Sequence, residues 1–212
     1  NYNTVVGDEA GTAITTGDSN IAIGYQALST EDAGSLSTAI GFQALKVQDV
    51  GAGNALNVAV GYQAGAAITT GIQNTIIGGL AGDALTTGSY NISIGYKALS
   101  SDTLGNRSVA IGREALLNQN FTSSTENYNV AVGYAAGLAI TTGIQNTLIG
   151  GLAGDANTTA DGNTAVGYAS LGANITGEAN VAVGATSLAA NTTGTTNVAV
   201  GNGSLGANTT AS

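Results

Sequence analysis

The stretch Asn57-Val58-Ala59-Val60-Gly61-Tyr62-Gln63-Ala64 decides the fold of this chain, because close relatives of it recur from one end to the other. Its glycine marks each copy. The twelve marker glycines are Gly7, Gly24, Gly41, Gly61, Gly78, Gly95, Gly112, Gly133, Gly150, Gly167, Gly184 and Gly201. Nine of the eleven spacings are 17 residues, and the other two are 20 and 21. So regular a repeat predicts one stacked array over residues 1–212, in which each copy is a rung.

The residues before each glycine have the pattern of a short strand. With the glycine numbered zero, position −1 is Val or Ile and position −3 is Thr, Val or Ile in every copy. Position −2 is Ala or Ser in nine copies, the exceptions being Val5, Ile76 and Leu148. β-Branched residues at a period of two are typical of strands, and apolar residues on both faces indicate a strand covered on both sides. We expect the β-branched face to point into a solenoid and the Ala-rich face to be covered by another chain.

Polar residues mark the turns of each rung. Position −4 is Asn in ten copies and Ser in two, which predicts either a ladder of side-chain amides between rungs or plain turn residues. Thr-Thr-Gly, as in Thr69-Thr70-Gly71, recurs as a turn signature after a predicted second strand or bend. Position +1 is aromatic in six copies. We expect these rings to pack over the rung, with an exposed sugar-binding ladder as the alternative. The aromatic residues are Tyr25, Phe42, Tyr62, Tyr96, Tyr134 and Tyr168.

Two rungs are longer than the rest, at residues 46–56 and 118–128. Each stands immediately before one of two similar segments, 57–91 and 129–163, which indicates duplication of a four-rung block. The long rungs should therefore bulge from the stack at corresponding places. Frequent Gly leaves no room for useful helices, so the expected fold is an all-β parallel β-solenoid of about twelve rungs, roughly 55–60 Å long.

The composition excludes several functions. Thirteen acids against Lys46, Lys97, Arg107 and Arg113 give a net charge of −9, so no basic surface for nucleic acid is expected. Without His or Cys, nucleophiles activated by histidine are impossible. No apolar run is long enough to predict membrane insertion. The absence of Met predicts an internal piece or a processed chain.

Neither catalysis nor metal binding is predicted. The adjacent acids Asp8-Glu9 and Glu31-Asp32 should point to opposite sides of an extended chain, as solvated turn charges rather than an acid/base pair. The turns at 17–20 and 161–163 faintly resemble calcium-binding turns, but their residues are those of ordinary turns. We therefore expect no enzyme activity, no cofactor and no metal site. Seven Asn-x-Ser/Thr sequons occur, and the last four, 17 residues apart, mark one column: Asn157, Asn174, Asn191 and Asn208.

The repeat N-[VIT]-[AS]-[VI]-G-x-x-[AS]-[LG], as in residues 20–28, 163–171 and 180–188, resembles two related groups of proteins. These are the repeat region of phage tail fibres and the head repeats of trimeric autotransporter adhesins, whose period is usually shorter. The resemblance covers nearly the whole chain. It implies a left-handed β-roll, a homotrimer, and a role in attachment to a host cell-surface receptor or glycan, on a virion or at a cell surface.

These observations predict a structural, non-enzymatic segment of a trimeric fibre that serves host attachment. The first alternative is an adhesin head whose own surface binds matrix or glycans, with the two long rungs as the first places to examine. The second is a monomeric solenoid that binds ice or calcium. The sequence does not identify receptor-binding residues.

Overall fold

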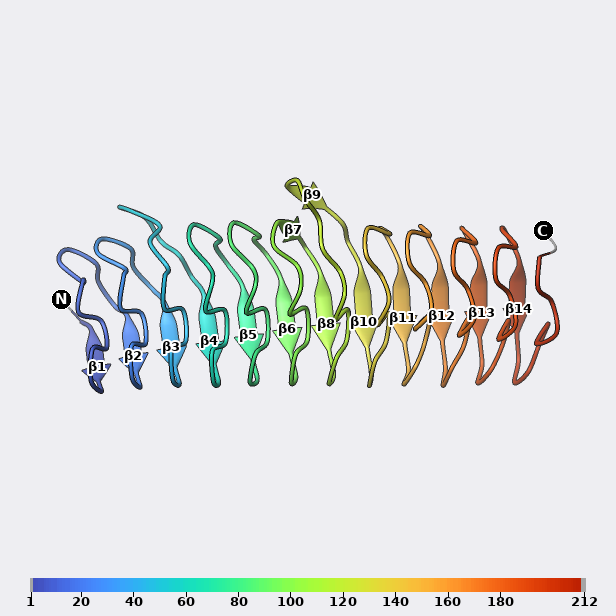
Figure 1. Cartoon of the computed structure of the whole chain (residues 1–212), viewed down its shortest axis with the longest axis horizontal. Helices are drawn as coiled ribbons and strands as arrows, with labels where there is room; N and C mark the ends of the chain where they lie inside the picture. The colour runs from blue at the N-terminus through green and yellow to red at the C-terminus, as the bar shows by residue number, and fades with distance from the viewer. Residues whose placement is uncertain (1, 211–212) are drawn as a thin grey trace.

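The computed structural model describes residues 2–210 and shows an all-β parallel solenoid of about twelve turns, with no helix among those residues (Figure 1). Each turn contributes one three-residue strand that ends just before its marker glycine. The twelve strands of the main sheet are β1 (Thr4–Val6), β2 (Ile21–Ile23), β3 (Thr38–Ile40), β4 (Val58–Val60), β5 (Thr75–Ile77), β6 (Ile92–Ile94), β8 (Val109–Ile111), β10 (Val130–Val132), β11 (Thr147–Ile149), β12 (Thr164–Val166), β13 (Val181–Val183) and β14 (Val198–Val200).

The strands pair in parallel and in chain order, so equivalent residues of successive rungs form straight columns along the rod. Ala39 pairs with Ala59 across the first long rung, just as Ala165 pairs with Ala182 across an ordinary one. The extra residues of the long rungs are therefore accommodated outside the sheet. This confirms the solenoid and the 17-residue period predicted from the sequence.

The assignment of the two strand faces was wrong. Alanines at position −2, such as Ala59 and Ala110, are fully buried inside the single chain. The β-branched side chains point outward, and Ile77 and Ile149 are 39% and 40% exposed. The coil is narrow, and buried leucines at position +4, such as Leu99, fill it from the other wall. Only a small side chain then fits at −2.

Inside the coil, a large residue at one repeat position is accompanied by a small residue at another. The seven rungs with Leu at +4 all have Ala or Ser at −2 and a polar residue at +7. In the five rungs with Gly at +4, a larger residue stands at −2 or +7, which explains the exceptions Ile76 and Leu148. A Cβ on Gly154, for example, would lie 2.8 Å from Cδ2 of Leu148. Large residues at one interior position are thus accompanied by small residues at another, as expected for a closely packed tube.

The marker glycine is required by the stacking itself. At Gly61 the backbone has φ +142°, and a Cβ there would lie 2.6 Å from the carbonyl oxygen of Gly78 in the next rung. The other markers up to Gly184 stack in the same way, with positive φ and a Cβ position within 3 Å of backbone. Rungs can approach this closely only without a side chain, so the glycine recurs in every copy.

Both long rungs extend beyond the other loops, as predicted (Figure 1). Each leans on the loop of the rung before it. In the first, Ser35 bridges to Asn54, and in the second, β7 (Gly105–Asn106) pairs in parallel with β9 (Thr125–Glu126). The described residues contain no helix that could cross a membrane.

The asparagine ladder is confirmed. Asn163 donates its amide to the carbonyl of Gly177 at 2.9 Å, and its Oδ1 accepts the backbone N–H of Asn180 at 2.9 Å. The side chain therefore closes its own rung and joins it to the next. The asparagines at this position from Asn20 to Asn180 are fully buried, so these bonds are shielded from water.

Candidate functional site

The outward side of the main sheet, which we call the outer sheet face, consists of positions −3 and −1 of all twelve rungs. Its 24 residues are Val, Ile or Thr in every case, and none is charged. Several are well exposed, such as Ile92 at 36% and Ile149 at 40%. Eleven strand spacings make a strip of roughly 53 Å, with an area on the order of 500 Å². The largest exposed apolar patch of a monomeric protein is commonly of this size and is often functional.

The aromatic residues after the marker glycines form a column on the surface. Tyr25, Phe42 and Tyr62 stack in succession, with centroids 5.3 Å apart in both pairs. Tyr62 is nevertheless 54% exposed, and Tyr168 is 60% exposed. Three of the six rings therefore pack on one another along the column, and all six keep between 39% and 60% of their surface in solvent.

Two carboxylates lie in the interior near the long rungs. Glu31 is fully buried, so the expectation that both members of the Glu31-Asp32 pair are solvated was wrong for this residue, although the two do point to different environments. Glu31 accepts hydrogen bonds from the backbone of Gly34 at 2.8 Å and from Nε2 of Gln48 at 2.9 Å. Asp8 and Glu9 are exposed.

The second buried carboxylate, Asp102, repeats this arrangement at the second long rung. It accepts hydrogen bonds from Nε2 of Gln119 at 2.6 Å and from the backbones of Gly105 and Phe121 at 3.1 and 3.2 Å. Burial raises the pKa of Asp102, and these hydrogen bonds oppose the rise. Both acids are thus satisfied by neutral donors and have no free oxygen for a reaction.

These networks explain the two rungs in which Ser replaces the ladder Asn. At the first, Nε2 of Gln48 also donates to the hydroxyl of Ser37 at 2.9 Å, while Oε1 of Gln48 accepts from Asn57 at 2.8 Å. Gln119, Ser108 and Asn129 make the equivalent contacts at the second long rung. A glutamine from across the coil therefore continues the ladder where serine is too short.

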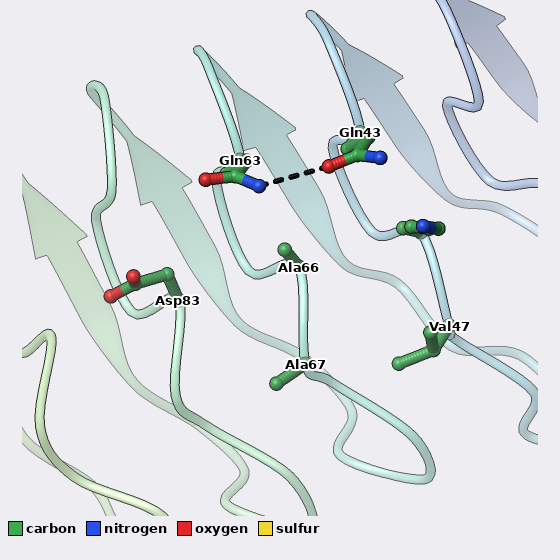
Figure 2. A pocket seen from close by; sticks show the side chains of 7 residues that line it. Gln43, Val47, Gln63, Ala66, Ala67 and Asp83 are labelled. Atoms are coloured by element: carbon green, nitrogen blue, oxygen red, sulfur yellow. Dashed lines mark hydrogen bonds between the residues drawn. The ribbon is translucent and has the colours of Figure 1, made fainter.

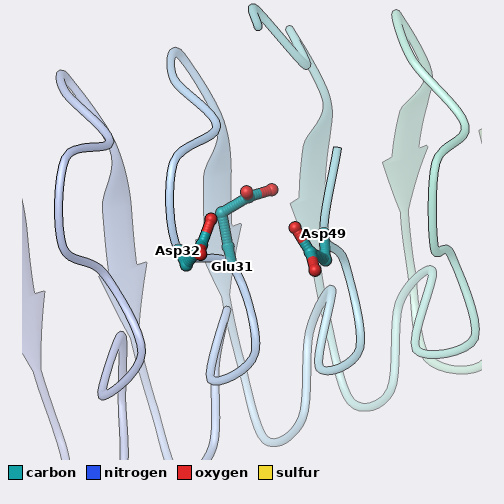
Figure 3. A group of neighbouring side chains, drawn as sticks. All are labelled: Glu31, Asp32 and Asp49. Carbon is teal, nitrogen blue, oxygen red and sulfur yellow. The ribbon is translucent and has the colours of Figure 1, made fainter. Parts of the chain in front are cut away.

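The structure brings together three acids that the sequence did not single out as a group. One oxygen each from Glu31, Asp32 and Asp49 lie within 4.8 Å of one another (Figure 3). Asp32 and Asp49 are 17 residues apart, so the period places them in one column. The oxygens of Glu31 are already hydrogen-bonded, and four rungs later the two exposed acids are replaced by Thr103 and Asn120, which hydrogen-bond at 3.1 Å. The group is therefore not a repeated feature of the long rungs.

The calcium-like turns have ordinary structural roles. Oδ1 of Asp18 accepts the backbone N–H of Tyr2, and Oδ1 of Asp161 accepts that of Ile144, each at 2.7 Å. The sequon column lies in the interior, since Asn157, Asn174 and Asn191 are fully buried. These asparagines fill position +7 of the tube and are not accessible for modification in the folded chain.

A pocket of about 400 Å³ opens on the segment after the sheet, between the third and fifth rungs (Figure 2). Its floor is Ala66 and Ala67, and the sides come from the neighbouring rungs. No lining residue belongs to a strand, so the pocket is separate from the outer sheet face. The lining residues are Gln43, Lys46, Val47, Gln63, Ala66, Ala67 and Asp83.

Comparisons of the chain with protein-family models, curated proteins and solved structures find no match.

Proposed function

We propose that the chain is a structural, non-enzymatic segment of a fibre, built from three copies side by side and serving attachment to a host surface. The supporting observation is the outer sheet face, which is β-branched and uncharged over its whole length. Parallel sheets are normally covered on both sides, and here only the inner side is covered by the chain itself. Other copies of the chain, with matching columns at the same spacing, are the simplest cover.

A fibre segment needs stiffness more than chemistry. Each rung bonds to the next through the strand, the asparagine column and the turn, as when Thr69 donates its hydroxyl to the carbonyl of Thr86 at 3.2 Å. Such a coil resists bending because every rung is held at several points around its circumference. The proposed setting is a virion tail fibre or a similar extracellular appendage, with the left-handed coil that the resemblance implies.

The solution mass measured by light scattering tests this proposal. The expected mass is three times the chain mass of 20.5 kDa. Val109→Lys, in the middle of the outer sheet face, should dissociate the assembly while preserving the circular dichroism spectrum. Thr70→Lys, in an exposed turn, is the matched control and should leave the mass unchanged. A monomeric wild-type chain would refute the three-copy assembly.

The adhesin head is the second candidate, favoured by the two long rungs that project from the stack. Their tips, residues 51–54 and 122–126, can be shortened without touching the buried glutamines beneath them. Under this alternative, shortening both tips abolishes adhesion to host cells or matrix. Under the fibre proposal, adhesion of the complete appendage is unaffected.

A further inference from the structure

The pocket over Ala66, which we call the Ala66 pocket, arises from the residues at one position of the repeat. Position +5 holds Lys46, Ala66 and Asp83 in three successive rungs, so a small residue stands between a cation and an anion. Figure 2 shows Asp83 on one side of the two alanines and the third rung on the other. Four rungs later the same three positions hold Leu117, Leu138 and Asp155.

The backbone is the same in both places. The N–H of Ala66 donates to the carbonyl of Gln63 at 3.3 Å, and that of Leu138 donates to the carbonyl of Ala135 at 3.2 Å. The following residue in each rung donates to the carbonyl of the aspartate one rung later, at 3.2 and 3.1 Å. The fold therefore accepts leucine at this position. The space over Ala66 results from the choice of side chain and is not imposed by the coil.

Lys46 is the one basic residue among residues 2–210 whose charge has no partner. Arg107 and Arg113 form ion pairs at 3.1 Å, and Lys97 lies over the ring of Tyr96. Lys46 stands two rungs from Asp83, which corresponds to about 10 Å along the rod. An unpartnered cation at one end of the pocket is suited to a negatively charged group of a ligand.

The middle and the far end of the pocket offer hydrogen-bond acceptors. Gln63 donates through Nε2 to Gln43 at 2.9 Å, which leaves its Oε1 without a donor in the described chain. Oδ1 of Asp83 is buried and also receives no hydrogen bond, and burial raises the pKa of this carboxyl. Hydroxyl groups of a ligand would donate to Oε1 of Gln63 and to the second carboxylate oxygen of Asp83, because Oδ1 is enclosed by the protein.

We propose that the Ala66 pocket binds a carboxylated sugar residue of a surface glycan, such as a sialic or uronic acid. The carboxylate contacts Lys46, ring hydroxyls donate to Asp83 and Gln63, and the apolar side of the ring lies on the alanines. A volume of about 400 Å³ falls in the range of small-ligand sites. A neutral sugar would form no ion pair with Lys46. A phosphate lacks the hydroxyl donors that the acceptors Gln63 and Asp83 require. The inference rests on the attachment role proposed above but not on the three-copy assembly.

The test is a titration of the isotope-labelled chain, followed by the shifts of its backbone amides. The probes are sialyllactose and a disaccharide ending in glucuronic acid, with lactose as the neutral control. We expect shifts at Ala66, Ala67 and Asp83, and affinity for at least one acidic sugar about tenfold higher than for lactose, because a charge-assisted hydrogen bond is added. No shift with either acidic sugar, or equal binding of lactose, would overturn the inference.

Matched variants locate the binding. Ala66→Leu copies the residue found four rungs later and should remove the shifts, whereas Leu138→Ala should leave them unchanged. Lys46→Gln should weaken binding of the acidic sugar about tenfold and leave lactose unaffected. If Ala66→Leu binds the acidic sugar as well as wild type does, the inference is overturned. If Ala66→Leu does not fold, undiminished binding by Lys46→Gln overturns it instead. A trimer by light scattering without sugar binding refutes this inference alone, and a monomer that binds the sugar refutes only the assembly.

Discussion

The exchange of volume inside the coil gives a quantitative prediction at the ninth rung. This rung has Leu148 at −2, Gly154 at +4 and Asn157 at +7. Replacing both Leu148 by Ala and Gly154 by Leu would give it the composition of the eleventh rung, which has Ala182 and Leu188. If the interior is one tube of constant volume, the two substitutions compensate each other.

Each single substitution should destabilise the fold. Leu148 is fully buried, so Leu148→Ala should cost about 3 kcal/mol through lost burial and a cavity. Gly154→Leu places a Cβ 2.8 Å from Leu148, and its φ of +56° is close to that of Leu45 at +47° in the same position. Since leucine adopts this backbone elsewhere in the repeat, the cost of about 2 kcal/mol comes mainly from overpacking.

The free energy of unfolding of the double variant should be about 2 kcal/mol lower than that of wild type. Independent effects would sum to about 5 kcal/mol, so the expected coupling energy is about 3 kcal/mol. Compensation is incomplete because Leu148 also fills the space beside Gly137, where a Cβ would lie 2.9 Å from its Cδ1. Urea unfolding followed by circular dichroism measures the four free energies. Leu148→Ala combined with the distant Leu45→Ala is the additive control. A double variant as unstable as the sum of the singles would refute the constant-volume argument.

Three further predictions concern other columns. Asn163→Ala should cost about 1–3 kcal/mol in urea unfolding, because it leaves the buried backbone N–H of Asn180 without its acceptor, while the carbonyl of Gly177 keeps Asn174 as a donor; Asn163→Ser should cost less, and equal losses would contradict the ladder's role. Gly61→Ala should prevent soluble folding, since its Cβ would lie 2.6 Å from backbone at φ +142°; a native circular dichroism spectrum would count against this. Burial raises the pKa of Asp155, so the protonated form favours folding below the unfolded value of 3.8, and this contribution is lost as the pH rises through the folded pKa. The stability of wild type relative to Asp155→Asn should therefore fall as the pH rises above 3.8, and a flat or rising difference would contradict the sign.

The sequence predicts the course of the chain but not the orientation of its strands. The period, the strands, the ladder and the bulges follow from spacing alone, because equivalent residues must stack. The assignment of strand faces failed because alternation shows only that two faces differ. Which face is inner depends on the width of the coil, and this is set by residues such as Leu99 and Gly82 on the opposite wall. The rule that Gly at +4 accompanies a larger residue at −2 or +7 does indicate that position −2 faces inward, because residues that compensate in size share one interior.

Spacing also limits what could be predicted about the candidate sites. Asp32 and Asp49 share a column at a spacing of 17, so their proximity was open to prediction. The burial of Glu31 could not be predicted from spacing, because it depends on Gln48, which extends across the coil and donates a hydrogen bond to the carboxylate. The pocket was equally hard to predict, since it is defined by the absence of a large side chain at Ala66.

The division between inside and outside accounts for the proposed function. Inside, each rung is complete, because small and large residues compensate and every ladder position has a partner, as Gln48 provides for Ser37. Variation there is constrained by neighbours in the same chain. Outside, the 24 sheet positions show no such compensation, yet they remain β-branched and uncharged throughout. Propensity for strands explains branching, since Val, Ile and Thr favour extended backbone. It does not explain why no charged side chain, and no polar one other than Thr, occurs on a face that meets water. A covering surface does explain it, and the loops and the +5 column are then the places left for recognition.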